Sequence, residues 1–427
     1  MAARADARIR EAAFLLLRQD HPQPDAEWLE SALTDPAESI RYLAIATLGE
    51  GGRPGDRDRL LKLLESTRMS RRLFEATMAA IAKIDGVLQA WRPGRNGDWW
   101  KSHGRITDIA VKLLNKPNLP PQTIRQAIEF LPPGHSALTV ARLKKLLDAP
   151  LDDIELQLTA IRAVPTSSAG RALLRRIAGD ERRHADVRAE AIMRLDPTRD
   201  AQLAEAMVGW AASGPAAVRE EALRSLRGVE LDARQKTRLR RIAEESFPLK
   251  QLVMLVLEPS RPVPRARPAS VDAWLGRLQG RPDARAGSRV FFHRRGPGCG
   301  RCHRIDGRGA TVGPNIVRPT GTDGYTRQAI LRAILRPSDE IALGYVPYRF
   351  WLDDGRVVTG VLKSESDTAY EIVDAEGHRV TVPRARIEAM SPSRESIMPE
   401  RLVDRMTDTE LRDVIEFIRR GTASTLR

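Results

Sequence analysis

Cys299-Gly300-Arg301-Cys302-His303 is the stretch that decides how this 427-residue sequence folds and what it binds, because it holds the only two cysteines. The C-x-x-C-H pattern is the attachment signature of c-type haem. Two thiols at this spacing reach the two vinyl groups of one porphyrin, and the histidine that follows places an imidazole under the iron. The sequence therefore predicts one covalent haem c, with Cys299, Cys302 and His303 as its attachment residues.

A zinc site, a redox-active dithiol and coincidence are the alternative explanations of these residues. A structural zinc ion takes four nitrogen or sulfur ligands, and the sequence offers no second C-x-x-C to complete the set. A thioredoxin-like pair stands at the head of a helix in a βαβ unit, whereas this pair lies between glycines and arginines at 296–298 and 308–309. The pattern favours haem attachment.

The residues downstream indicate how His303 is held. Gly313-Pro314-Asn315-Ile316 begins ten residues after His303. A ligating imidazole usually donates its other N–H to a carbonyl or carboxylate, which fixes the ring and raises its basicity. We expect the carbonyl of Pro314 to accept this bond; the alternative is an ordinary loop proline. We expect Gly307, Gly309 and Gly313 to let the backbone turn close to the porphyrin edge.

Five side chains compete for the sixth position on the iron: Met390, Met398, Met406, His293 and His378. Met398 is followed by Pro399 and lies between a polar turn and a short helix, so a loop can aim its sulfur at the iron. Met406 lies in a helical pattern, where core packing is the better explanation. We expect Met398 to be the ligand, with His378 in a hairpin turn as the main alternative.

Motifs follow one another along residues 281–420: Arg289-Val290-Phe291-Phe292, Cys299 to His303, Gly313-Pro314-Asn315-Ile316, Ile334-Leu335-Arg336-Pro337-Ser338, Ile341-Ala342-Leu343-Gly344-Tyr345 and Ser396-Ile397-Met398-Pro399-Glu400. In these motifs and their order the segment resembles the haem-binding cytochrome c domain of the Pirellula/Verrucomicrobium type, which is found in planctomycetes and their relatives. Two of the motifs have Ile where the family has Leu, at Ile316 and Ile397. The resemblance implies a single haem c with His303 as the proximal ligand and Met398 as the distal one.

The chain between the two expected ligands is longer than a compact cytochrome c needs. Four runs alternate apolar and polar residues and are bounded by D-G and E-G turns, which is a hairpin signal: Val346–Leu352, Val357–Leu362, Ala369–Val373 and Arg379–Val382. We expect a small antiparallel β insert at about residues 345–388. Asp353 and Asp354 lie at a hairpin tip, where turn formation explains them better than catalysis.

Residues 1–257 carry a repeat and no chemical motif. An apolar register at i, i+4, i+5 and i+8 begins at Ile40, Leu73, Leu156, Val187 and Val218, with a blurred copy at Ile124. The last four copies are 32, 31 and 31 residues apart. Such self-similarity indicates a helical solenoid, the alternative being an irregular bundle. The period is below the value of about 40 usual for HEAT repeats, so the segment resembles short HEAT-like repeats.

The predicted fold is therefore mainly α, in two domains. A HEAT-like α-solenoid covers residues 1–257, and a mono-haem cytochrome c-type helical domain with the β insert covers residues 271–427. The Pro/Arg-rich residues 258–270 break the helical period. We expect them to form a semi-rigid linker.

Charge and hydropathy restrict the partners. The formal net charge is +14, but the arginines are scattered without a concentrated patch or an aromatic stacking motif, so we expect no nucleic acid partner. No span approaches the length of a transmembrane helix. Haem c is attached outside the cytoplasm in bacteria, so we expect an extracytoplasmic location such as the periplasm. No signal peptide is visible, because the apolar run Ala12–Leu17 is too short and fits a first helix better.

We expect an electron-transfer cytochrome with no substrate site of its own, a carrier rather than an enzyme. Its partners would be redox proteins, with a further protein partner on the helical repeats, which act as an interaction scaffold. Two alternatives remain open: a haem-dependent oxidoreductase or cytochrome subunit of a dehydrogenase, and a repeat scaffold with an accessory haem domain. A thioether ligand raises the reduction potential of a haem, so His303 and Met398 together predict a moderately high potential.

Overall fold

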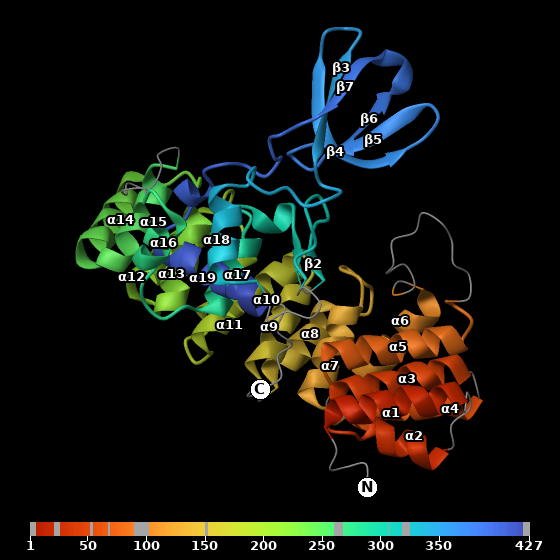
Figure 1. The fold of residues 1–427 in the computed structure, drawn as a ribbon. Helices are drawn as coiled ribbons and strands as arrows, with labels where there is room; N and C mark the ends of the chain where they lie inside the picture. Colours follow the sequence, from red (N-terminus) through yellow and green to blue (C-terminus); the bar gives the residue numbers. More distant parts are fainter. Residues whose placement is uncertain are drawn as a thin grey trace. The chain divides into compact units, whose positions relative to one another are not determined.

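The computed structural model of the chain is mainly α-helical, with 19 α-helices and a C-terminal five-stranded antiparallel sheet within the part that it describes (Figure 1). The chain divides into two compact units, one up to Leu174 and one from Arg175 onward, and the division falls within α10 (Ser168–Gly179). The described residues are 6–20, 26–51, 54–66, 69–88, 101, 103–149, 153–259, 268–305, 307–317 and 325–421.

The first unit consists of paired helices. Odd-numbered helices pack on one another in order, α1 on α3, α3 on α5, α5 on α7 and α7 on α9. Ser70 and Asp153 cap α5 and α9 by accepting the N–H of the residue three positions on, which satisfies a donor that the helix itself leaves free. The helices are α1 (Ala7–Asp20), α2 (Ala26–Leu33), α3 (Glu38–Gly51), α4 (Pro54–Ser66), α5 (Arg71–Ile84), α6 (Gly104–Asn115), α7 (Pro121–Phe130), α8 (Val140–Asp148) and α9 (Ile154–Ala163).

The repeated apolar register lies in the core of these helices. In α7 the buried residues at this spacing are Thr123, Ala127, Ile128 and Leu131, so the blurred copy begins at Thr123 and not at Ile124, which is only partly buried. The three clear copies of this unit are buried throughout: Ile40, Ala44, Ile45 and Leu48; Leu73, Thr77, Met78 and Ile81; Leu156, Ala160, Ile161 and Val164.

The second unit begins with helices of the same kind. The registers that start at Val187 and Val218 are buried in α11 and α13, which pack on each other, and α13 also packs on α15. Four further helices follow along the chain. The helices are α11 (Ala185–Met193), α12 (Ala201–Ser213), α13 (Ala216–Leu226), α14 (Ala233–Glu245), α15 (Phe247–Leu257), α16 (Val271–Arg277), α17 (Ala284–Phe292), α18 (Arg327–Leu335) and α19 (Asp408–Arg420).

Helices from both sides of the expected linker belong to this second unit, because α11 packs on α17. Residues 260–267 of the linker expected at 258–270 lie outside the described residues. Its role as a spacer stays a prediction.

The crossing of α17 and α19 anchors a hydrophobic cluster. A Cβ added to Gly287 would lie only 1.9 Å from the carbonyl oxygen of Asp413, so the glycine lets the two helices touch. The rings of Phe291 and Phe417 meet edge to face with centroids 5.5 Å apart. The buried members of the cluster are Trp274, Leu278, Val290, Phe291, Ile305, Ile330, Leu331, Ile334, Leu402, Val403, Met406, Leu411, Val414, Ile415 and Ile418.

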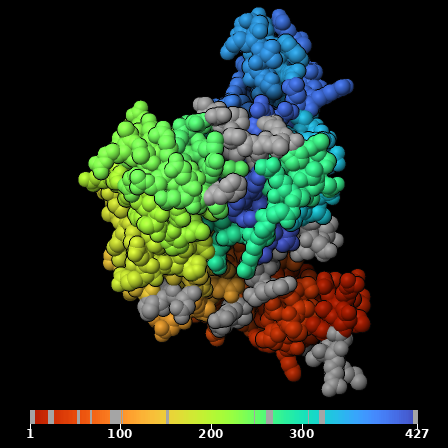
Figure 2. All heavy atoms as spheres, turned by 90° about the vertical axis from the view of Figure 1, so that its left-hand side faces the viewer, coloured from red at the N-terminus to blue at the C-terminus, as the bar shows by residue number. Residues whose placement is uncertain are grey.

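The five-stranded sheet has the order β6-β5-β4-β3-β7 and is antiparallel throughout. Its own small core is formed by Phe350, Leu352, Ile372 and Val382. The atoms of the sheet form a closely packed lobe, coloured blue in Figure 2. The prediction of an antiparallel insert with four strands is confirmed by β3 (Pro347–Leu352), β4 (Val357–Glu365), β5 (Ala369–Val373) and β6 (Arg379–Pro383).

A fifth strand, β7 (Ile387–Pro392), was not predicted and extends the insert beyond residue 388. It pairs with β3, whose residues lie far earlier in the chain, for instance Phe350 with Met390. A 3₁₀ turn, Arg384–Arg386, connects it to β6 in place of a two-residue hairpin turn. The usual short-range hairpin signal is therefore missing. Within the described ranges, no helix is both long and apolar enough to cross a membrane.

Candidate cofactor site

The cysteines and the histidine of the C-x-x-C-H motif lie on one helical turn. The turn is a short 3₁₀ helix, Cys299–Arg301, introduced by Gly298 in the left-handed region at φ +85°. The N–H of His303 donates to the Cys299 carbonyl at 2.9 Å, and that of Cys302 donates to the same oxygen at 3.1 Å. Residues at i, i+3 and i+4 of a helical turn share one face, so the two thiols and the imidazole can address one ligand.

Both cysteines are free thiols. Burial raises the pKa of Cys299 to about 12, and burial also raises the pKa of Cys302. The thiolate is the form that attacks a disulfide, so thiols with raised pKa values disfavour a redox-active dithiol. Moreover, among the residues that the structure describes, no three His, Cys, Asp or Glu side chains gather as a metal site would need.

The His303 ring is held by the loop that follows it. Its Nδ1 lies 2.9 Å from the carbonyl oxygen of Pro314, which is the contact that the sequence predicts. Because a carbonyl can only accept, Nδ1 carries the proton and Nε2 keeps its lone pair. Burial lowers the pKa of His303, and the bond to Pro314 opposes this shift. The ring is therefore a neutral imidazole with a defined tautomer and one nitrogen ready to bind a metal.

Gly313 forms the seat of the imidazole. A Cβ added there would lie 2.9 Å from Cε1 and 3.1 Å from Nδ1 of His303, closer than side-chain carbons normally approach. Any residue other than glycine would push the ring away from the Pro314 carbonyl. This explains the glycine of the G-P-N-I motif without any appeal to backbone flexibility.

We expect Gly313→Ala to displace the His303 ring and to weaken its bond to Pro314. Loss of an outer partner of a metal-binding histidine typically costs about 10- to 100-fold in metal affinity or activity. The tautomer of His303 in ¹⁵N NMR spectra, compared with that of a Gly344→Ala variant, measures the effect. Gly344 has a left-handed φ of +83° but open space around it, so it controls for backbone strain. An unchanged His303 tautomer in Gly313→Ala would contradict this account.

The same loop is fastened through its backbone to the turn at residues 299–303, which we call the attachment turn after the role expected of it. Gly313 N–H donates to the Cys302 carbonyl at 2.8 Å, and Ile316 N–H to the Arg304 carbonyl at 2.8 Å. Two short strands, β1 (Arg304–Ile305) and β2 (Arg308–Gly309), pair between them. At Gly309, with φ +95°, a Cβ would lie 2.2 Å from the His303 carbonyl oxygen. Gly309 and Gly313 thus let the backbone approach His303 closely. The expected approach of the glycines to a porphyrin edge stays a prediction.

Met398 lies against the same hydrophobic cluster as Cys299 and Phe292. Its N–H donates to Ser396 Oγ at 3.1 Å, and the N–H of Ser396 donates to Ser338 Oγ at 3.1 Å. Two separate sequence motifs, around residues 338 and 398, are thereby joined. The thioether of Met398 is partly buried against apolar side chains, and Cys299 packs against the same cluster.

Of the competing side chains, Met406 lies in the same cluster, and Met390, His378 and His293 have other surroundings. Met406 is 1% exposed within the hydrophobic cluster, which confirms its expected core role. Met390 lies on β7 opposite Phe350. The His378 ring is 75% exposed in the β5–β6 turn, with Nδ1 3.3 Å from Asp374. His293 is buried, and its Nδ1 accepts the Arg295 N–H at 2.9 Å.

No family model matches this chain, and no curated protein matches it. The geometry above and the sequence motifs are therefore the basis for its function.

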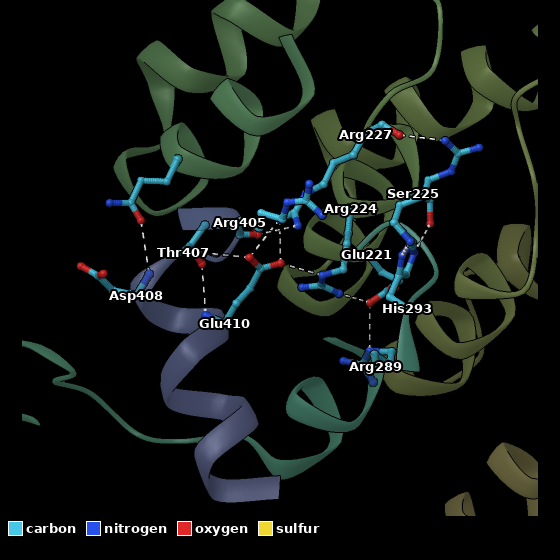
Figure 3. A network of polar contacts seen from close by, with 12 residues as sticks. Glu221, Arg224, Ser225, Arg227, Arg289, His293, Arg405, Thr407, Asp408 and Glu410 are labelled. Carbon is cyan, nitrogen blue, oxygen red and sulfur yellow. Dashed lines mark hydrogen bonds and ion pairs between the residues drawn. The ribbon is translucent and has the colours of Figure 1, made fainter. Parts of the chain in front are cut away.

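A buried ionic network next to the site was missed by the sequence analysis (Figure 3). Glu410 on α19 accepts hydrogen bonds from Arg224, which lies within α13, and from Arg227, which follows the end of α13, at 2.7 Å each. Glu221 is ion-paired with Arg224 and lies 3.3 Å from Arg289 of α17. The network joins α13 to the two helices that cross beside the attachment turn.

Little in the sequence could have revealed this network. The pattern Thr407-x-x-Glu410 before an apolar run predicts only a helix cap. That cap is present, because Glu410 Oε2 accepts the Thr407 N–H at 2.9 Å and Thr407 Oγ1 accepts the Glu410 N–H at 3.1 Å. The arginines lie nearly two hundred residues away in the chain and carry no motif.

Proposed function

We propose that this protein is an electron-transfer c-type cytochrome that holds one haem covalently, with His303 and Met398 as axial ligands. The observation that carries the proposal is the attachment turn: two neutral thiols and a neutral imidazole on one face, with His303 Nδ1 bonded to Pro314. The resemblance of residues 281–420 to the planctomycete-type haem-binding domain supports the same function.

The residues present fit this cofactor. Each thiol, Cys299 and Cys302, would add across one vinyl group, so that a carbon–sulfur bond forms, the thiol hydrogen goes to the vinyl carbon and no oxidant is needed. His303 would bind through Nε2, because Nδ1 is held by Pro314. The bound haem supplies a one-electron Fe(III)/Fe(II) couple. The apolar cluster around Cys299 and Met398 would exclude water from its face.

The proposal extends to the architecture and location. We infer that the repeated helices before residue 258 form a HEAT-like interaction scaffold and that the helices after residue 270 form the cytochrome c-type domain. The packing of α1, α3, α5, α7 and α9 in order supports the first part. Redox proteins are the proposed partners of the haem, and an extracytoplasmic location follows from where haem c is attached.

Covalent attachment is tested by expressing the full chain with a haem c maturation system. We expect a red protein whose pigment survives acid–acetone extraction, and a colourless Cys299→Ala/Cys302→Ala variant. A Cys-free variant that keeps extraction-resistant pigment, or a wild-type protein that never acquires any, would refute the proposal.

The distal ligand is tested in the same matured protein. We expect Met398→Ala to lose the weak methionine–iron absorption band in the red and to lower the reduction potential, because a thioether ligand favours ferrous iron relative to nitrogen ligands or water. Met390→Ala is the matched control, since Met390 lies on β7 with 37% exposure. The band should remain in that variant. If Met398→Ala keeps the band, the sixth ligand is another residue.

A further inference from the structure

The five-stranded sheet reaches the loop that holds His303 through one side chain, Lys363 of β4. Its Nζ donates to the carbonyl oxygens of Thr311 at 3.2 Å and Val312 at 3.1 Å. These carbonyls come immediately before Gly313 and Pro314, the residues that seat and orient the imidazole. Lys363, sixty positions after His303 in the sequence, thus binds the same loop whose Pro314 carbonyl is hydrogen-bonded to the His303 ring.

A break in strand pairing directs Lys363 toward this loop. Leu362 pairs with Ile372 and Ser364 pairs with Glu371, so Lys363 is the extra residue of a β-bulge. Bulges turn a side chain away from the direction that regular alternation would give it, and they are frequent next to functional sites. The ammonium also lies 4.8 Å from the centroid of the Tyr345 ring, an attractive contact that favours this one orientation.

The loop is held from two sides. On the sheet side, a Cβ added to Gly377 in the β5–β6 turn would lie 3.4 Å from Val312 Cγ2, so this turn also touches the loop. On the other side, Gly313 N–H donates to the Cys302 carbonyl. Residues 311–313 therefore lie between the sheet and the attachment turn, and Lys363 makes the polar contacts of the sheet side.

We propose that Lys363 is a positioning residue for the proximal histidine. By binding the carbonyls of Thr311 and Val312, it fixes the loop so that the Pro314 carbonyl faces His303 Nδ1 and Nε2 points toward the ligand. The β insert thereby has a role at the haem. The inference rests on the proposed function for the identity of that ligand, but the positioning is a property of the chain alone and is measured without haem.

The test uses the full-length, haem-free protein with ¹⁵N-labelled histidine and Lys363→Met. Removing two charge-assisted hydrogen bonds should let the loop open more often, so we expect amide hydrogen exchange at Gly313 to become about tenfold faster. We also expect the His303 signal to lose its pure Nδ1–H character, because the Pro314 bond that selects this tautomer weakens. Lys363→Arg keeps a charged donor and should restore both readouts.

Arg384→Met is the matched control. Arg384 is a cation of the same sheet that also lies over a tyrosine, 4.1 Å from the Tyr370 centroid, but it binds the sheet's own Ser366 carbonyl. Its removal should leave Gly313 and His303 unchanged. Lys363→Gln serves as a second variant, with circular dichroism to verify folding.

The two proposals fail in different ways. If Gly313 exchange and the His303 tautomer are unchanged in folded Lys363→Met and Lys363→Gln, the positioning role is overturned, whatever the haem does. If the wild-type protein acquires no covalent pigment while both readouts change, the positioning role holds and the haem proposal falls.

Discussion

Replacing Glu410 by glutamine is expected to destabilise the second unit by about 3–5 kcal/mol, the usual cost of breaking a buried ion pair. The carboxylate is 2% exposed and accepts hydrogen bonds from Arg224 and Arg227 (Figure 3). Its loss would remove the carboxylate that these two buried guanidinium groups share, while Arg224 would keep its ion pair with Glu221. Glutamine also suits the third position of a capping box, so we expect the cap with Thr407 to remain. The measured loss of stability then comes from removing the charge of Glu410.

The same carboxylate predicts an acid-sensitive stability. Burial by itself raises the pKa of Glu410, but the charges of Arg227 and Arg224 and hydrogen bonds from Arg224 and the Thr407 N–H outweigh it and lower the pKa to about 2 from 4.5. A depressed folded-state pKa gives stability that is present above the unfolded pKa and is lost as the pH falls. We expect about 3 kcal/mol to disappear between pH 5 and 2 in the wild type, and this contribution to be absent in Glu410→Gln.

Native-state hydrogen exchange of the α19 amides measures both effects, because these amides report on this unit alone. Glu416→Gln is the control on the same helix. The Glu416 side chain is itself 4% exposed, but its partners Arg419 and Arg420 are 43% and 62% exposed. Solvent screens such pairs, so we expect a loss of about 1 kcal/mol. Equal losses in Glu410→Gln and Glu416→Gln would show that the buried network adds no special stability.

Gly287→Ala is expected to destabilise the crossing of α17 and α19 by about 3 kcal/mol or more, at the upper end for overpacked cores. The added methyl group would lie 1.9 Å from the Asp413 carbonyl oxygen and 2.9 Å from the Phe417 Cβ. Backbone atoms cannot rotate away, so the helices must separate. Because α17 leads directly into the attachment turn, we also expect a lower yield of matured protein.

Gly209→Ala makes the matched comparison. Gly209 lies inside α12 with nothing within 4 Å of an added Cβ, so the higher helix propensity of alanine should stabilise that helix by about 1 kcal/mol. Urea unfolding of both variants gives the two values. A Gly287→Ala protein as stable as wild type would mean that the two helices are not in contact as described.

Local periodicity predicted much of the fold. Four strands of the sheet follow from alternation and D-G or E-G turns, and the inward faces of α3, α5, α9, α11 and α13 follow from the apolar register. Strand β7 was missed because its pairing with β3 is long-range and lacks a hairpin turn. In α7 the buried residue that begins the register, Thr123, is polar. A search for apolar residues therefore began the register at its neighbour Ile124.

In the candidate site, too, contacts between residues close together in the sequence were predicted, and contacts between distant residues were not. Cys299, Cys302, His303 and Pro314 lie within sixteen residues, so spacing alone predicted that they meet, and the His303–Pro314 contact is observed. Glu410 and Lys363 could not be predicted, since each meets partners far away in the chain. No local pattern encodes such contacts. They depend on helix crossing in one case and on a bulge in the other.

The first and last strands of the insert, β3 and β7, bring the chain back to the point where it enters the sheet. Tyr348 at the start of β3 is opposite Pro392 at the end of β7, and the Ser393 N–H donates to the Pro347 carbonyl at 2.7 Å. The entropy of closing a loop grows only slowly with its length. The chain therefore enters and leaves this sheet at neighbouring points, so residues 347–392 can fold as a lobe without separating the segments that precede and follow them.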